Sequence, residues 1–182
     1  MAAWRGYACG GERQVEQGRV TSRASAYLNA LPAAKARAEL TRCCGAGRWV
    51  DAMLAARPFG SDVELLAVAE RVWWALGRAD WLEAFAAHPR IGASTTTEWA
   101  RREQAGVIGA GDATLATLER QNSAYEQRFG HVFLICATGR TADEILEALR
   151  HRLTNDPATE LRIAAGEQAK ITRLRLDKLV AP

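Results

Sequence analysis

The sequence predicts an all-α fold: a single compact multi-helix domain with one extended apolar segment near residues 131–136. Apolar residues recur at helical spacing along most of the chain, and residues favoured in strands are sparse. The 182 residues, 48% apolar and 25% charged, suffice for one packed core but not for two ordinary domains. Residues 25–182 are expected to form this domain. Residues 1–24 carry scattered charges and glycines without an apolar run, and are expected to be an unstructured extension.

Helix boundaries in the first half of the domain are marked by proline, glycine and capping residues. Pro32 can open a helix at its first turn, and Gly45 ends that helix. Ser61 can cap a later helix, with Glu64 three residues on as its capping-box partner. The helices expected from these signals and from helical spacing span residues 33–44, 49–56, 62–76 and 80–87.

Similar signals mark the second half of the domain. Gly130 closes a long helix, and Thr141 with Glu144 forms a capping box. Asp156 can cap the last helix, because Pro157 fits its first position. The helices expected here span residues 99–106, 112–128, 142–153 and 157–179.

Residues 131–136 break the helical pattern. This stretch, His-Val-Phe-Leu-Ile-Cys, is apolar and rich in β-branched and aromatic residues, which is typical of a buried strand. The chain offers no second strand with which it could pair, and an isolated strand has no ladder to join. The stretch is therefore expected to thread between the helices as an extended segment.

Composition argues against several classes of function. The net charge of +3, from 24 basic and 21 acidic residues, is too small and too well mixed to indicate a nucleic-acid partner. No apolar run approaches the ~18 residues that a membrane span needs, so no membrane partner is expected. The cysteines lack zinc-site spacing and are expected to be reduced thiols of a cytoplasmic protein. They are Cys9, Cys43, Cys44 and Cys136.

Several catalytic motifs are absent from the sequence. It has no G-x-x-x-x-G-K-[ST] loop, G-x-G-x-x-G turn, H-E-x-x-H pair or G-x-S-x-G elbow. Phosphoryl transfer, redox chemistry with a bound cofactor, zinc hydrolysis and serine esterase chemistry are therefore disfavoured. No cofactor and no metal is expected, and acid–base chemistry by side chains alone remains open.

The segment Ala-His-Pro-Arg-Ile-Gly at residues 87–92 places one of three histidines at a helix end. A residue before proline is pushed out of the helical region, so the helix must end at or before His88. The negative end of the helix dipole favours the protonated ring, which is what a general acid requires. The alternative is an inert histidine that caps its own helix. His131 is expected to pack or contact a loop, and His151 to face solvent.

A second group of candidates lies on later helices. Glu103 and Gln104 follow Ala100 at helical spacing, so the three share one face. A carboxylate beside an amide can bind a ureido or amide group, although a solvated polar face is the alternative. Arg175, in the last helix, can clamp a carboxylate through its planar fork or remain in solvent as a cation that complements the helix dipole.

Several separated motifs resemble the OHCU decarboxylase family. They are Ala-His-Pro-Arg-Ile-Gly at 87–92, Arg-Glu-Gln-Ala-Gly-Val at 102–107, Asn-x-x-Tyr at 122–125 followed by Arg-Phe-Gly-His-Val-Phe-Leu-Ile-Cys-Ala-Thr-Gly-Arg at 128–140, and Ile-x-x-Leu-Arg-Leu-x-x-Leu at 171–179. The resemblance covers roughly residues 25–179. The motifs occur along the chain in the order found in the family, so a chance similarity is a poor explanation.

The resemblance implies an all-helical homodimer that needs no cofactor. Its small-molecule substrate would be 2-oxo-4-hydroxy-4-carboxy-5-ureidoimidazoline, decarboxylated to (S)-allantoin and CO2 in urate breakdown. The family's catalytic positions fall on His88, Glu103 and Arg175, with His88 as the expected acid. Its substrate-binding positions fall on Pro89, Ala100, Gln104, His131, Val132, Phe133, Leu134 and Ile135.

One position departs from the family pattern. Many members carry a serine where this chain has Ala100, and a lost neutral hydrogen bond is worth on the order of 0.5–1.5 kcal/mol. The substitution is expected to weaken substrate binding without removing the chemistry. Two other hypotheses remain open: another cofactor-free lyase with the same His-Glu pair, and a non-enzymatic helical module whose tryptophans and arginines form a partner surface.

Overall fold

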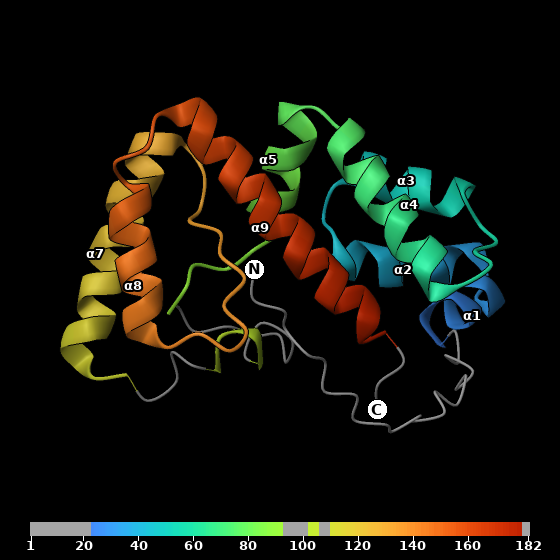
Figure 1. Cartoon of the computed structure of the whole chain (residues 1–182), viewed down its shortest axis with the longest axis horizontal. Coiled ribbons are helices and arrows are strands. Elements are labelled where there is room, and N and C mark those ends of the chain that lie inside the picture. Colours follow the sequence, from blue (N-terminus) through green and yellow to red (C-terminus); the bar gives the residue numbers. More distant parts are fainter. Residues whose placement is uncertain (1–22, 93–101, 106–109, 180–182) are drawn as a thin grey trace, which may run out of the picture.

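The computed structural model describes residues 23–92, 102–105 and 110–179 of the chain. Within these ranges the protein has eight helices and no strand, which confirms the all-α prediction (Figure 1). The helices are α1 (Arg23–Ala30), α2 (Ala33–Cys43), α3 (Gly47–Ala55), α4 (Asp62–Ala75), α5 (Arg78–Ala86), α7 (Asp112–Phe129), α8 (Ala142–Arg152) and α9 (Pro157–Asp177). None of the described helices is long and apolar enough to cross a membrane.

Helix α9 is the central element of the fold. It contacts α2, α4 and α5 on one side and α7 on the other. Figure 1 shows α7 and α8 running side by side at one end of the molecule, and α1 to α4 grouped at the opposite end. The last helix therefore joins the two halves of the domain.

The caps expected from the sequence are present. The Ser61 hydroxyl accepts a hydrogen bond from the Glu64 backbone at 3.1 Å, and Thr141 and Glu144 form a reciprocal capping box. Asp156 accepts hydrogen bonds from two backbone amides in the first turn of α9, as an N-cap does. These side chains satisfy amides that have no partner within the helix.

Two helices and the domain itself begin earlier than the sequence predicts. Helix α5 begins at Arg78, because the Asp80 carboxylate accepts the Gly77 backbone N–H at 3.1 Å and completes a cap there. Helix α3 begins at Gly47 rather than at residue 49. Helix α1 begins at Arg23, before the expected domain start, and Ala24 is buried in the core. The remainder of the expected extension, residues 1–22, lies outside the described residues.

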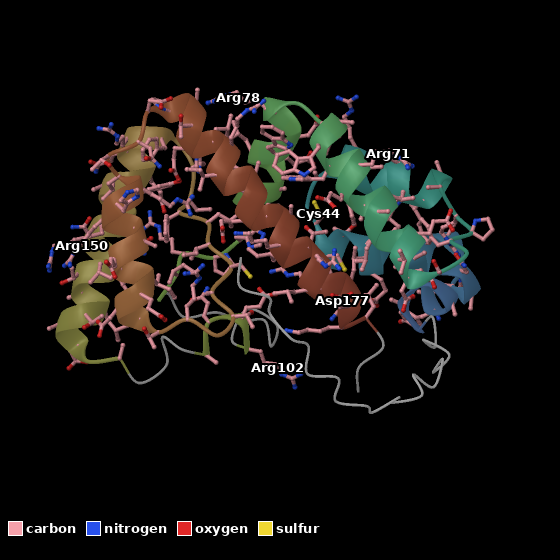
Figure 2. All side chains as sticks on the ribbon, viewed as in Figure 1. Cys44, Arg71, Arg78, Arg102, Arg150 and Asp177 are labelled. Atoms are coloured by element: carbon pink, nitrogen blue, oxygen red, sulfur yellow. The ribbon has the colours of Figure 1, made fainter. Side chains whose placement is uncertain are left out.

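The core consists of two clusters of buried apolar side chains. The larger one joins α1 to α5 with α9, and the smaller one joins α7, α8 and the segment between them. In the larger cluster the Trp73 indole donates to the Ala165 carbonyl at 2.9 Å, and the Trp49 indole donates to the Ala69 carbonyl at 3.0 Å. These buried indoles keep a polar partner while their rings fill the core. Arginines such as Arg71 and Arg150 point outward (Figure 2).

The extended segment at residues 131–136 has no helical structure and no paired strand among the described residues, as expected. Its side chains alternate between the two clusters: Leu134 packs into the larger one, while Phe133 and Ile135 pack into the smaller one. This alternation is the period of two that an extended backbone imposes. The segment is apolar on both faces because it lies between two cores.

Candidate active site

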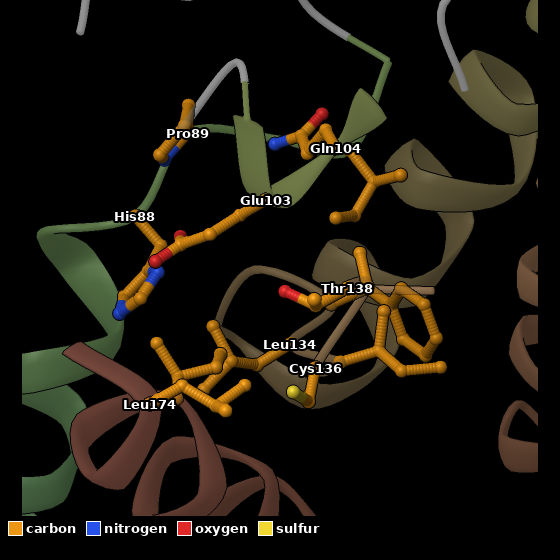
Figure 3. A pocket seen from close by; sticks show the side chains of 13 residues that line it. His88, Pro89, Glu103, Gln104, Leu134, Cys136, Thr138 and Leu174 are labelled. Carbon is orange, nitrogen blue, oxygen red and sulfur yellow. The ribbon is translucent and has the colours of Figure 1, made fainter. Parts of the chain in front are cut away.

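One cavity gathers most of the residues singled out in the sequence. The empty space within it, counting the part that opens to solvent, is about 430 Å³. It lies between the end of α5, the helical turn at 102–105, the extended segment and α9 (Figure 3). The lining residues are His88, Pro89, Ile91, Glu103, Gln104, Phe133, Leu134, Ile135, Cys136, Ala137, Thr138, Ile171 and Leu174.

Some expected positions lie elsewhere. His131 and Val132 line a separate hollow beside α5 and α7, and the His131 ring packs against the Phe85 and Tyr125 rings. The extended segment thus lines the cavity from Phe133 onward, later in the sequence than expected. Ala100 lies outside the described residues. Of the other histidines, His151 is exposed, as expected.

Glu103 and Arg175 form a bidentate ion pair beside the cavity. The Arg175 Nε and Nη2 atoms donate to the two Glu103 carboxylate oxygens, each at 2.8 Å. Both side chains are largely buried, 12% and 17% exposed. Arg175 Nη1 also donates to the Arg42 carbonyl at 3.2 Å, so each of its three guanidinium nitrogens has a partner. The geometry rules out a freely solvated Arg175.

His88 is held at the C-terminal end of α5. Its backbone N–H donates to the Phe85 carbonyl at 3.0 Å, so the backbone and not the ring satisfies this carbonyl. The preceding residue, Ala87, lies against the loop after α2, where a Cβ built on Gly45 would come within 2.6 Å of the Ala87 Cβ. Glycine at that position therefore allows the end of α5 to approach α2 closely.

The surroundings of His88 favour the neutral ring. Burial, followed by the neighbouring Arg175 guanidinium, lowers the pKa of His88 from 6.5 to about 4, against the opposing effects of Glu103 and Gln168. The expectation that a helix end would favour imidazolium is therefore wrong for the free protein. Desolvation and a nearby cation outweigh the partial charge of the helix terminus.

The segment after His88 is fixed by side chains from the following helices. The Gln104 side-chain oxygen accepts the Gly92 backbone N–H at 3.0 Å, and the Asn122 amide donates to the Ile91 carbonyl at 3.0 Å. Gln104 is 8% exposed, so the Glu-Gln pair is not a solvated face. Gly92 has φ 83°, a left-handed conformation that glycine adopts without strain.

The extended segment is anchored from its other side by buried charges. Arg152 Nη1 donates to the Leu134 carbonyl at 2.7 Å, and the Cys136 backbone N–H donates to Glu167 Oε2 at 2.8 Å. Backbone groups on alternate residues of an extended chain point to opposite edges. The N–H and C=O of Ile135 therefore point the other way, and they have no hydrogen-bond partner among the described residues.

Arg152 is itself part of a buried network. Its guanidinium donates to Glu160 Oε1 at 2.9 and 2.5 Å, and the Tyr125 hydroxyl donates to the same oxygen. Asn155 donates to the other carboxylate oxygen at 2.7 Å, and Arg152 lies over the Phe133 ring at 4.7 Å. Every charge in this network is compensated, which burial requires.

The thiols near the site are protonated. Burial raises the pKa of Cys136, which lines the cavity, and raises the pKa of Cys44 to about 11. A neutral thiol is a weak nucleophile. Among the described residues there is also no group of three or more histidine, cysteine or acidic side chains that could hold a metal ion. The cavity is therefore lined by one neutral histidine and by the Glu103 carboxylate, while its partner Arg175 does not line the cavity.

Known proteins resemble this chain in sequence and in fold. Residues 29–177 match the family described as OHCU decarboxylase. The chain belongs to the OHCU decarboxylase family. A crystal structure of OHCU decarboxylase in the presence of (S)-allantoin is similar, with a TM-score of 0.72 and 38% identity, over 79% of this chain and 98% of that chain. The match to this family confirms the resemblance noted in the sequence.

Two curated relatives are also similar to this OHCU decarboxylase family member. The uric acid degradation bifunctional protein TTL of Arabidopsis thaliana is 42% identical over 146 residues, which are 75% of this chain and 45% of that protein. The 2-oxo-4-hydroxy-4-carboxy-5-ureidoimidazoline decarboxylase of Amia calva is 42% identical over 91 residues, 49% of this chain and 51% of that protein. The chain spans about half the length of these two relatives.

Arg152, Glu160 and Glu167 of this OHCU decarboxylase family member were not predicted from the sequence as functional residues. A signal for the two glutamates was present. Glu160 and Glu167 fall at helical spacing with the buried Ala164 and Ile171, so each places a carboxylate on the apolar face of α9. A charge on a buried face needs a partner, and that need points to a buried cation such as Arg152.

Proposed function

We propose that this chain catalyses the cofactor-free decarboxylation of 2-oxo-4-hydroxy-4-carboxy-5-ureidoimidazoline to (S)-allantoin and CO2. The observation that carries the proposal is that His88 and Glu103 line one cavity, with Arg175 bound to Glu103, in a chain of this family. In the reaction, the bond between ring carbon C4 and the carboxyl group breaks, and CO2 leaves. The electron pair moves into the adjoining C5=N imine, which leaves an enol between C4 and C5 and negative charge on the nitrogen. A proton then adds to one face of C5, the ring carbon that bears the ureido group, while the C4 hydroxyl becomes the carbonyl of allantoin and its proton passes to the nitrogen.

His88 is the proposed acid. It is neutral in the free protein, because burial and Arg175 lower its pKa. An anionic substrate in the cavity adds negative charge beside the ring and offsets Arg175, which raises the pKa of His88. The imidazole of His88 then takes up a proton, and it passes that proton to C5 of the substrate after CO2 leaves. Its position at the cavity wall fixes the face that is protonated.

The remaining residues are proposed to bind the substrate. Each Glu103 oxygen accepts one hydrogen bond from Arg175 and retains lone pairs for a ureido N–H. Gln104 uses its oxygen on Gly92, so its amide hydrogens are the groups that can meet a ureido carbonyl. The wall of the cavity is completed by the backbone of Ile135, by Pro89, and by the side chains of Phe133 and Leu134. The Arg175 cation supplies positive charge near the substrate carboxylate.

The test is an assay in which freshly generated substrate is added to the protein and circular dichroism monitors the formation of (S)-allantoin. Replacing His88 with Gln is expected to lower kcat by roughly 10²–10⁴-fold, the usual contribution of a positioned acid. His151→Gln is the matched control, because His151 is exposed and outside the cavity. A near-normal kcat in the His88 variant contradicts the role of His88. Absence of product with the unaltered protein contradicts the proposed reaction and favours another lyase or a binding module.

The proposal includes a homodimeric cytoplasmic protein, as the family resemblance implies. The free thiols of Cys43, Cys44 and Cys136 support a reducing compartment. The mass in solution, measured by light scattering, tests the dimer.

A further inference from the structure

Among the described residues that line the cavity, Thr138 alone carries a hydroxyl group. Figure 3 shows the Thr138 side chain directed into the cavity from the loop after the extended segment, facing His88 and Glu103 across it. The hydroxyl has no hydrogen-bond partner among the residues that the structure describes. A hydroxyl can donate one hydrogen bond and accept two, so this group can bind a ligand in the cavity.

A tight turn fixes the position of this side chain. The Arg140 backbone N–H donates to the Ala137 carbonyl at 3.0 Å, which closes a four-residue turn with Thr138 as its second residue. The third residue, Gly139, has φ 80°, the value that a type II turn has at this position. Arg140 Nε also donates to the Cys136 carbonyl at 3.2 Å. These contacts hold Thr138 at the edge of the cavity without using its hydroxyl.

The wall that faces Thr138 carries the ionisable groups of the site. His88 and Glu103 lie there, with Arg175 bound to Glu103. Under the proposed function, C4 and C5 of the substrate lie against this wall, because C4 carries the carboxylate and C5 receives the proton from His88. The substrate ring has five members, and its C2 carbonyl lies across the ring from the C4–C5 bond. The C2 oxygen therefore points toward the wall that carries Thr138.

Negative charge develops on that side of the ring during the reaction. When CO2 leaves, the electron pair moves into the C5=N imine and places the charge on the nitrogen between C5 and C2. This nitrogen is bonded to the C2 carbonyl, so the charge is shared with the C2 oxygen, as in a deprotonated amide. A donor aimed at this oxygen binds it more strongly in the transition state than in the substrate, and only such an interaction lowers the barrier.

We infer that Thr138 is a substrate-binding residue whose hydroxyl donates a hydrogen bond to the C2 carbonyl oxygen of the substrate ring. The orientation of the ring in this inference rests on the proposed function. The hydroxyl keeps its proton throughout the reaction, and the hydrogen bond strengthens as charge reaches the oxygen. Thr138 therefore contributes to kcat more than to binding of the uncharged ring.

Steady-state allantoin formation by Thr138 variants tests the inference. Thr138→Val keeps the shape of the side chain but removes the hydroxyl, and it is expected to lower kcat by roughly ten- to a hundredfold with a rise in KM of no more than about threefold. Thr138→Ala should lose as much, whereas Thr138→Ser keeps a hydroxyl and should retain most of kcat. Thr159→Val is the matched control, because Thr159 is exposed and does not line the cavity. An unchanged kcat in Thr138→Val, or an equal loss in Thr138→Ser, overturns the inference.

Equilibrium binding identifies the ring atom without turnover. Hydantoin and 2-thiohydantoin share one ring and differ only at C2, where sulfur replaces oxygen and accepts hydrogen bonds more weakly. We expect the unaltered protein to bind hydantoin more tightly than 2-thiohydantoin in calorimetric titrations, and Thr138→Val to bind the two alike. Absence of a preference in the unaltered protein, or an unchanged preference in Thr138→Val, contradicts the assignment of the C2 oxygen.

The two experiments separate this inference from the proposed function. If Thr138→Val forms allantoin as fast as the unaltered protein does, the function stands and the role of Thr138 fails. If the unaltered protein forms no allantoin but prefers hydantoin through Thr138, the proposed reaction fails and the hydrogen bond from Thr138 to the ring carbonyl stands.

Discussion

At the residue scale, the site depends on how three charged or titratable groups share one small volume. Arg175 binds Glu103 through Nε and Nη2, and its positive charge lowers the pKa of the neighbouring His88. Glu103 opposes that effect. The free protein therefore keeps a neutral histidine beside a neutralised ion pair. A substrate carboxylate would disturb this balance in the direction that protonates the histidine.

Arg175→Lys is expected to lower kcat/KM by about ten- to a hundredfold. Lysine keeps the charge but cannot make two parallel hydrogen bonds to Glu103, and a hydrogen bond to a charged group is worth about 1.5–3 kcal/mol. Steady-state allantoin formation measures the effect. Arg173→Lys, on the exposed face of the same helix, is the control and should leave kcat/KM unchanged. Equal effects in the two variants would contradict a specific role for the fork.

The stability of the protein is expected to fall between about pH 6.5 and pH 4 partly because of His88. The unfolded chain protonates this ring near pH 6.5, whereas the folded protein does so only near pH 4, so the unfolded state binds more protons in that window. Stability therefore decreases as the pH falls, by up to roughly 3 kcal/mol from this group. Urea unfolding at pH 7 and pH 4.5 measures it. The loss should be smaller in His88→Gln, and an equal loss in both proteins would contradict the low pKa.

At the element scale, the extended segment is held in place by side chains rather than by a neighbouring strand. Arg152 and Glu167 bind the backbone of alternate residues from one edge, and the two apolar clusters hold the side chains. On the opposite edge, the backbone of Ile135 has no hydrogen-bond partner among the described residues. A regular sheet would have consumed both edges in its ladder.

Arg152→Met is expected to destabilise the protein by about 3–5 kcal/mol, because it leaves the Glu160 carboxylate buried without a cation. Glu160→Gln added to Arg152→Met should recover part of this loss, since the uncompensated charge is removed. Urea unfolding midpoints measure both. Arg150→Met, an exposed change in the same helix, is the control and should alter stability little. A double variant no more stable than Arg152→Met would show that the charge is not the cause.

At the scale of the whole molecule, α9 connects the two clusters and supplies groups to the site. It contacts helices from both halves, and it carries Arg175, Gln168 and Glu167 along one length. Folding of this helix onto the rest of the domain therefore assembles the core and the cavity together.

Backbone amides in the middle of α9, around Ala164 to Ile171, are expected to exchange with solvent only on global unfolding. Ala164, Ala165, Gln168 and Ile171 are buried, and α9 contacts helices of both halves of the molecule. Helix α1 contacts α4 at the periphery and should exchange through local opening. Native-state hydrogen exchange measures the two free energies. Faster exchange in the middle of α9 than in α1 would contradict a central role for this helix.

The sequence predicts local features well and distant pairings poorly. Caps at Ser61, Thr141 and Asp156 depend on residues within three positions, so the pattern reveals them. The Glu103–Arg175 pair joins residues 72 positions apart, and no local rule predicts it. The direction of the His88 pKa shift also escaped prediction, because it depends on burial and on the distant Arg175 and not on the helix that His88 follows.

The extended segment also constrains how this chain can vary. Its side chains alternate between two cores, and the backbone of alternate residues is bound by buried charges. Substitution of one apolar residue by another changes one contact. Insertion or deletion of a single residue would exchange the two faces of everything beyond it, moving Leu134 or Ile135 into the wrong core and the wrong carbonyl toward Arg152. The length of this stretch should therefore be less free to change than its composition.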